Sequence, residues 1–234
     1  MPRPSVHPPV TKTLDALTRE QAAFVALATS GDPDLPVPSC PAWTVDDLVR
    51  HLAQVHRWAA ASTWTPPDGA LPDAELFAVP AGTEDYAGAA AALRAALADP
   101  QRPCRTLVGP GVVAWWARRQ LHETFVHRLD LAEALGDPVE GDPWIAADCI
   151  AEGIDTMQPR QVRLGRMTAP ETGISLRTPS GSWTLGARPV ATVSGPDLAL
   201  AQLLWRRTGL DDPRLSVTGD VAEATALLTQ RLTP

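Results

Sequence analysis

Several residue types and patterns are scarce in this 234-residue chain, and each scarcity excludes a class of protein. Lysine occurs once, at Lys12, and only 20 basic residues face 27 acidic ones. The resulting net charge of −7 argues against a nucleic-acid-binding protein. No apolar run reaches the roughly 18 residues that a membrane-spanning helix needs, and the N-terminus lacks the apolar core of a signal peptide. We therefore expect a cytoplasmic protein with neither a nucleic-acid nor a membrane partner.

Cysteine is also sparse. Cys40, Cys104 and Cys149 are odd in number and share no CxxC spacing. A disulfide framework is therefore not expected, and the three thiols fit a reducing compartment. Arginine, alanine and proline are abundant, which we interpret as the codon usage of a GC-rich genome. The hydrophobic fraction of 44% is that of a globular protein with a substantial core.

The first half of the chain is dominated by helical patterns. Apolar spacing and terminating residues predict helices over residues 11–29, 44–62, 83–98 and 112–135. The second of these begins at Thr44, and Asp47 three residues later suggests a capping box with the shorter acid. The proline-rich segment 35–43 before it is predicted to be an extended loop. Four helices joined by loops predict a helical bundle.

The second half has a different character. Residues 136–143, GDPVEGDP, form a predicted linker between domains. The expected elements after it are a helix over 145–157, strands over 174–177, 182–185, 190–193 and 215–217, and helices over 196–206 and 220–232. We therefore predict an α+β protein. Its expected parts are a flexible tail over 1–10, a four-helix bundle over 11–136 and a small mixed α/β domain over 144–234.

The histidines suggest a metal site inside the bundle. Four of the five lie on the second and fourth predicted helices: His51, His56, His122 and His127. His122 and His127 are five residues apart, so a helix rotates them by about 140° and they are poorly placed to share a metal. Glu123 and His127 are four apart and share a helix face. With His51 they would form the three-ligand set of a catalytic zinc site that keeps an open position. From spacing alone, the alternative is that both histidines are core residues and Glu123 pairs with Arg119.

Two segments of the bundle resemble the mycothiol-dependent maleylpyruvate isomerase family, a branch of the DinB-like bundles. They are 38–52, PSCPAWTVDDLVRHL, and 116–130, WARRQLHETFVHRLD. Ala42 stands where the family often has glycine. The resemblance continues over LLWRR, 203–207, and LSVTGD, 215–220, which are similar to the family's sterol-carrier-like C-terminal domain.

The resemblance implies that His51, Glu123 and His127 bind a metal, expected to be zinc, and that mycothiol is the thiol cofactor. A metal-bound thiolate would add to an activated double bond and leave again, which gives cis–trans isomerisation. With another electrophile the same site would perform S-transfer. The resemblance also implies a substrate-handling arginine in the C-terminal domain, for which Arg206 and Arg207 are equal candidates. The codon bias agrees with the actinobacterial setting of mycothiol.

Other side chains around the expected site each have two interpretations. Arg119 would bind a substrate or cofactor carboxylate, or it would orient Glu123 through a salt bridge. Asp130 is a candidate at the cofactor site, where it would orient a metal ligand; the alternative is a pair on the surface. His56 and Trp58 are candidates for cofactor binding. The alternatives are a pocket-mouth or bundle-surface position for His56, and a core position or a pocket wall for Trp58.

Three functions follow from these patterns. The first is a zinc- and mycothiol-dependent isomerase or S-transferase, a monomer or small homo-oligomer that acts on a small electrophilic or anionic molecule. The second is a non-catalytic binding or regulatory protein with the same fold. The third is a thiol-independent metallohydrolase that uses zinc-bound water. The complete ligand set favours an enzyme, because a binding protein has no need of an open metal position.

Overall fold

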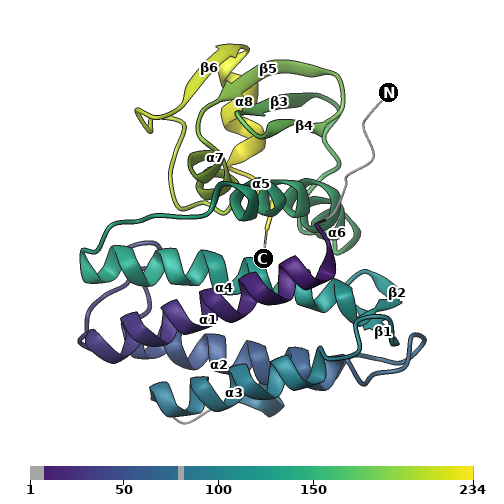
Figure 1. Ribbon diagram of the computed structural model, residues 1–234. Coiled ribbons are helices and arrows are strands. Elements are labelled where there is room, and N and C mark those ends of the chain that lie inside the picture. The colour runs from purple at the N-terminus through teal and green to yellow at the C-terminus, as the bar shows by residue number, and fades with distance from the viewer. Residues whose placement is uncertain (1–7, 79–81, 234) are drawn as a thin grey trace. The chain divides into compact units, whose positions relative to one another are not determined.

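The computed structural model describes residues 8–78 and 82–233. Within these residues the chain divides into two compact units, one ending at Val139 and the other beginning at Glu140, which is inside the expected linker. A helical part is followed by a small sheet-containing part, as the predicted α+β class requires (Figure 1). Residues 1–7 of the expected tail lie outside the described residues, and Val10 already begins a helix. No helix among the described residues is long and apolar enough to cross a membrane.

The first unit is built from four long helices. They are α1 (Val10–Ser30), α2 (Val45–Ser62), α3 (Thr83–Ala96) and α4 (Val113–Leu135), each within two residues of its predicted ends. Helices α1 and α2 each contact both α3 and α4, so the four enclose one core (Figure 1). The largest side chains buried in it are aromatic and leucine residues, among them Phe24, Leu48, Tyr86, Trp116 and Phe125.

Local signals fix the ends of the two helices that carry the histidines. The Thr44 hydroxyl accepts from the Asp47 N–H at 3.3 Å, and the Asp47 carboxylate accepts from the Thr44 N–H at 3.0 Å. The predicted capping box is thereby confirmed. Helix α4 ends at Gly136, whose φ of 71° is a left-handed conformation that favours glycine. A local signal thus delimits one end of each helix that carries predicted ligands.

Three elements of the first unit were not predicted. Strands β1 (Pro103–Thr106) and β2 (Gly109–Val112) form an antiparallel hairpin, and a 3₁₀ turn, η1 (Ala74–Phe77), interrupts the loop after α2. The strand sequences PCRT and GPGV contain proline and glycine and show no apolar alternation, so periodicity gives no signal. The indole N–H of Trp116 donates to the Arg105 carbonyl at 2.9 Å and attaches the hairpin to α4.

The second unit places helices before and around a four-stranded sheet. Its helical elements are α5 (Pro143–Glu152), the π-helical turn η2 (Gly153–Met157), α6 (Gln158–Arg163), α7 (Asp197–Leu204) and α8 (Val221–Leu228). The strands are β3 (Gly173–Thr178), β4 (Gly181–Gly186), β5 (Pro189–Ser194) and β6 (Ser216–Gly219), in the order β4-β3-β5-β6. The predicted hairpin between β3 and β4 is confirmed. The single helix expected over 145–157 is instead three successive helical segments that continue to Arg163.

Candidate metal centre

The proline-rich segment before α2 folds into two consecutive β-turns rather than an extended loop. The Cys40 N–H donates to the Val37 carbonyl at 3.0 Å, and the Trp43 N–H donates to the Cys40 carbonyl at 2.8 Å. Pro38 and Pro41 hold the second position of each turn, where a fixed φ favours proline. The Val37 N–H then donates to the Trp43 carbonyl at 2.9 Å and closes the loop. The spacing of these two prolines was the signal that sequence reasoning missed.

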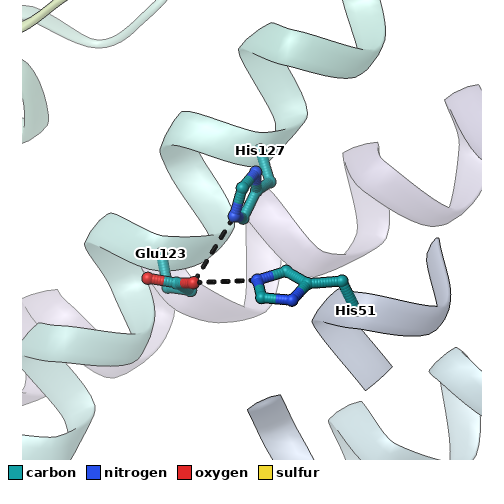
Figure 2. A group of neighbouring side chains, drawn as sticks. All are labelled: His51, Glu123 and His127. Atoms are coloured by element: carbon teal, nitrogen blue, oxygen red, sulfur yellow. Dashed lines mark ion pairs between the residues drawn. The ribbon is translucent and has the colours of Figure 1, made fainter. Parts of the chain in front are cut away.

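Helices α2 and α4 bring the three predicted ligands together. One possible ligand atom from each of His51, Glu123 and His127 lies within 4.8 Å of the other two. The Nε2 atoms of His51 and His127 lie 3.5 Å and 3.4 Å from the same oxygen, Oε1 of Glu123. Figure 2 shows both rings converging on that carboxylate, His51 from one helix and the other two side chains from the neighbouring one. Two imidazole nitrogens and one carboxylate oxygen are a donor set that suits zinc and similar divalent metals.

Asp130 fixes the orientation of the His127 ring. Its Oδ2 atom lies 2.9 Å from Nδ1 of His127, so the ring donates from Nδ1 and directs Nε2 toward Glu123. The other carboxylate oxygen accepts the Ser39 hydroxyl at 2.8 Å. Asp130 is 1% exposed. The structure therefore places Asp130 behind a predicted ligand and not in a surface pair.

Arg119 lies on the other side of Glu123. Its guanidinium contacts Oε2 of Glu123 and is almost completely buried, so Oε1 is left to face the two histidines. This is the position expected of a residue that orients Glu123. Its alternative role in binding a substrate or cofactor carboxylate stays a prediction.

The buried charges of the site influence one another. Burial disfavours the Glu123 carboxylate, but Arg119 together with His127 and His51 holds the pKa of Glu123 well below its usual range. Burial also disfavours a charged His127, but hydrogen bonds to Asp130 and Glu123 outweigh it and raise the pKa of His127 to about 9. A metal ion at Nε2 of His127 would take the place of the proton.

One side of the cluster is accessible. The side chain of His51 is 31% exposed, against 16% for Glu123 and 9% for His127. The Trp43 ring covers part of both histidines, with centroid distances of 4.6 Å to His51 and 6.2 Å to His127. A ligand would therefore approach from the His51 side, past Trp43.

His56 does not lie where the sequence analysis expected it, at a pocket mouth or on the bundle surface. It is completely buried, because position 56 is rotated by about 140° from His51 and faces the core. Its Nδ1 lies 2.8 Å from the Gln120 amide oxygen, and its Nε2 lies 3.2 Å from the Gln21 amide nitrogen. The amide oxygen of Gln21 accepts a hydrogen bond from the Arg94 guanidinium at 2.6 Å, so the NH₂ group of Gln21 must face His56. Burial lowers the pKa of His56 to about 4.

Trp58 attaches the loop after α2 to that helix. Its indole N–H donates to the Pro72 carbonyl at 2.8 Å, and its ring meets the Trp116 ring edge to face at 5.3 Å. It lies seven residues after His51 and therefore on the same face of α2. Its predicted contact with a cofactor stays a prediction.

Arg206 and Arg207 follow α7 in the second unit. Arg206 is exposed and has a left-handed backbone with φ of 62°. Arg207 is half-buried and donates to the carbonyl of Trp205 at 2.8 Å. These positions give no reason to prefer one arginine for substrate handling, so both stay candidates.

Comparison with known protein families shows which family the chain belongs to. Residues 14–132 match the "Mycothiol maleylpyruvate isomerase N-terminal domain", and residues 145–226 match the "MDMPI C-terminal domain". The chain belongs to the mycothiol maleylpyruvate isomerase family. The resemblance noted in the sequence is thereby confirmed.

Solved structures of this family share the fold. A crystal structure of the mycothiol-dependent maleylpyruvate isomerase matches with a TM-score of 0.63, and a histidine-to-alanine mutant of it with a TM-score of 0.65. Each match covers 92% of this chain and 96% of the other at 14% identity. At that identity the likeness establishes the fold alone. A search of curated proteins found no match.

Proposed function

We propose that this member of the mycothiol maleylpyruvate isomerase family is a metal-dependent enzyme that uses mycothiol as its thiol cofactor. The observation that carries the proposal is the convergence of His51, Glu123 and His127 around one carboxylate oxygen. The solved relatives with this fold are named for mycothiol-dependent isomerisation of maleylpyruvate. The expected metal is zinc, and the expected compartment is the cytoplasm.

The chemistry follows from the donor set. A bound divalent metal would lower the pKa of a thiol and hold it as the nucleophilic thiolate. The protein's own residues prepare the site. Asp130 keeps the proton of His127 on Nδ1, and Arg119 neutralises the outer oxygen of Glu123. Neutral imidazole and ionised carboxylate are the forms in which these side chains bind metal.

The reaction is cis–trans isomerisation through reversible thiol addition, or S-transfer to an electrophilic metabolite. The substrate is a small electrophilic or anionic molecule. We assign its carboxylate to Arg206 or Arg207, and to Arg119 if that side chain leaves Glu123. Trp58 and His56 were the other candidates for cofactor contact. Of these two, Trp58 is favoured, because it is half-buried on the same face of α2 as His51, whereas His56 is enclosed in the core.

The test is metal analysis followed by thiol titration. We expect about one equivalent of zinc to copurify with the protein and mycothiol to raise the Tm of the zinc-loaded form. Maleylpyruvate should then be isomerised only when mycothiol is present. Zinc without any mycothiol-induced rise in Tm would favour a thiol-independent metallohydrolase. Absence of any zinc binding would favour a non-catalytic binding protein.

A further inference from the structure

Ser39 is joined to the candidate metal centre across a long stretch of sequence. Its hydroxyl donates to Oδ1 of Asp130 at 2.8 Å, although the two residues are 91 positions apart. The second oxygen of the same carboxylate accepts from Nδ1 of His127 at 2.9 Å. The three side chains therefore form a chain that runs from the proline-rich loop to a predicted ligand.

We propose that Ser39 is a positioning residue of the metal centre, which acts on His127 through Asp130. An aspartate carboxylate turns readily about its last side-chain torsion, because that torsion has no sharp staggered minima. Hydrogen bonds to both oxygens remove this freedom. With Ser39 bound to Oδ1, the plane of the carboxylate is set so that Oδ2 meets the imidazole N–H. The inference rests on the proposed metal binding by His51, Glu123 and His127.

The backbone around Ser39 is itself held in place. Ser39 is the third residue of the first β-turn, between Pro38 and Cys40, and the turn is closed by the hydrogen bond from Cys40 to Val37. The ring of Pro38 fixes the φ of the second turn position, which restricts the backbone next to Ser39. The Ser39 hydroxyl is therefore held in one place. This explains why a loop residue can orient a side chain on α4.

The same loop also contacts the ligand on the other helix. Trp43, at the end of the second turn, packs its ring 4.6 Å from the ring of His51. The loop thus reaches His127 through Ser39 and Asp130, and His51 through Trp43. Metal binding and the conformation of this loop should therefore be coupled, because both histidines must be oriented together to share one ion.

The experiment compares two variants of equal shape, Ser39→Thr and Ser39→Val. They differ only in that threonine keeps the hydroxyl and valine replaces it with a methyl group. Zinc affinity is measured by competition with a chromophoric chelator, and folding is checked by the Tm of the zinc-free proteins. Loss of hydrogen-bond partners behind metal ligands typically weakens metal affinity by about 10- to 100-fold. We expect S39V to lie at the lower end of that range, about 10-fold weaker than S39T.

Ser180→Ala is the matched control. The Ser180 hydroxyl donates to the carboxylate of Asp197 at 3.0 Å in the second unit, so S180A removes the same kind of bond away from the histidines. It should leave zinc affinity unchanged. A second readout is the exchange of the His127 Nδ1–H with water, followed by ¹⁵N NMR in the zinc-loaded protein: this exchange should be faster in S39V than in S39T.

The outcomes distinguish the positioning role of Ser39 from the proposed metal binding on which it rests. Equal zinc affinities and equal exchange rates of the His127 Nδ1–H in S39V and S39T overturn the positioning role while metal binding stands. An equal loss of affinity in S180A overturns it as well, because the effect would then be one of general stability. Failure of the unsubstituted protein to bind zinc overturns the proposed function instead.

Discussion

Nδ1 of His127 and Oδ2 of Asp130 lie 2.9 Å apart on the same helix, three residues from each other. Glu123 precedes His127 by four residues, so positions 123, 127 and 130 follow one another along a single face of α4. One helix therefore supplies an oxygen ligand, a nitrogen ligand and the carboxylate that orients the nitrogen ligand. Only His51 must be brought from elsewhere, and α2 provides it.

Asp130→Ala is expected to weaken zinc binding by about 10- to 100-fold, because His127 would lose the acceptor that fixes its ring. The measurement is a chelator competition at neutral pH. Asp197→Ala is the matched control, since Asp197 is also buried and accepts the hydroxyls of Thr178 and Ser180 in the second unit. Both variants should lose stability, but only D130A should lose zinc affinity. Equal zinc affinities in the two variants would contradict the role of Asp130.

Two histidines on α2 should respond in opposite ways to substitution. His51→Ala should abolish stoichiometric zinc binding and cost the metal-free protein little stability, because the side chain is one-third exposed. His56→Gln should keep zinc and destabilise the fold by about 1–3 kcal/mol, because it disturbs buried hydrogen bonds to Gln120 and Gln21. Zinc content by elemental analysis and urea unfolding separate the two effects. Zinc loss in H56Q with full retention in H51A would show that the ligand was assigned to the wrong histidine.

The four helices of the bundle and the pairing of Glu123 with His127 could be predicted from the sequence for a physical reason. Helix periodicity fixes which residues share a face over a few turns, so Glu123 and His127 could be paired without a structure. The capping box at Thr44 and the glycine at position 136 likewise act over only a few residues. Each of these predictions depends on local geometry.

The residues that were misplaced or missed owe their positions to contacts between segments that are distant in the sequence. Ser39 meets Asp130 across 91 residues, and no local pattern reports that pairing. Helix geometry turns position 56 away from His51, but the surroundings of His56 come from α1, α3 and α4, so its complete burial also requires the packing of those helices. The β1–β2 hairpin was missed because its short strands carry proline and glycine in place of an alternating apolar pattern.

The buried His56 should make stability depend on pH. Its pKa is about 4 in the folded protein and about 6.5 in the unfolded chain. Well above pH 6.5 the ring is neutral in both states and its contribution to stability is complete. As the pH falls below 6.5, the unfolded chain binds a proton that the folded protein does not, so stability is lost until the pH approaches 4. At pH 5 the loss amounts to about 2 kcal/mol.

The measurement compares the unfolding free energies of the unsubstituted protein and His56→Gln at pH 7.5 and pH 5, with a chelator present in every sample. Glutamine does not titrate, so the destabilisation caused by H56Q should be about 2 kcal/mol smaller at pH 5 than at pH 7.5. Other titrating groups are common to both proteins and cancel in the difference. A destabilisation that is the same at both pH values would mean that the folded protein protonates His56 as readily as the unfolded chain does.

The capping box at the start of α2 should stabilise the bundle and leave metal binding intact. Thr44→Ala removes the hydroxyl that accepts the Asp47 N–H and should cost about 1 kcal/mol in urea unfolding. Thr18→Ala is the control, because Thr18 lies exposed in the middle of α1, where its hydroxyl bonds to the Leu14 carbonyl and alanine is the better helix former. That variant should be neutral or slightly more stable. His51 lies two turns inside α2, so zinc affinity should be the same in both variants once they are folded. If T44A weakens zinc binding tenfold at full folding, the first turn of α2 positions His51 more directly than its hydrogen bonds indicate.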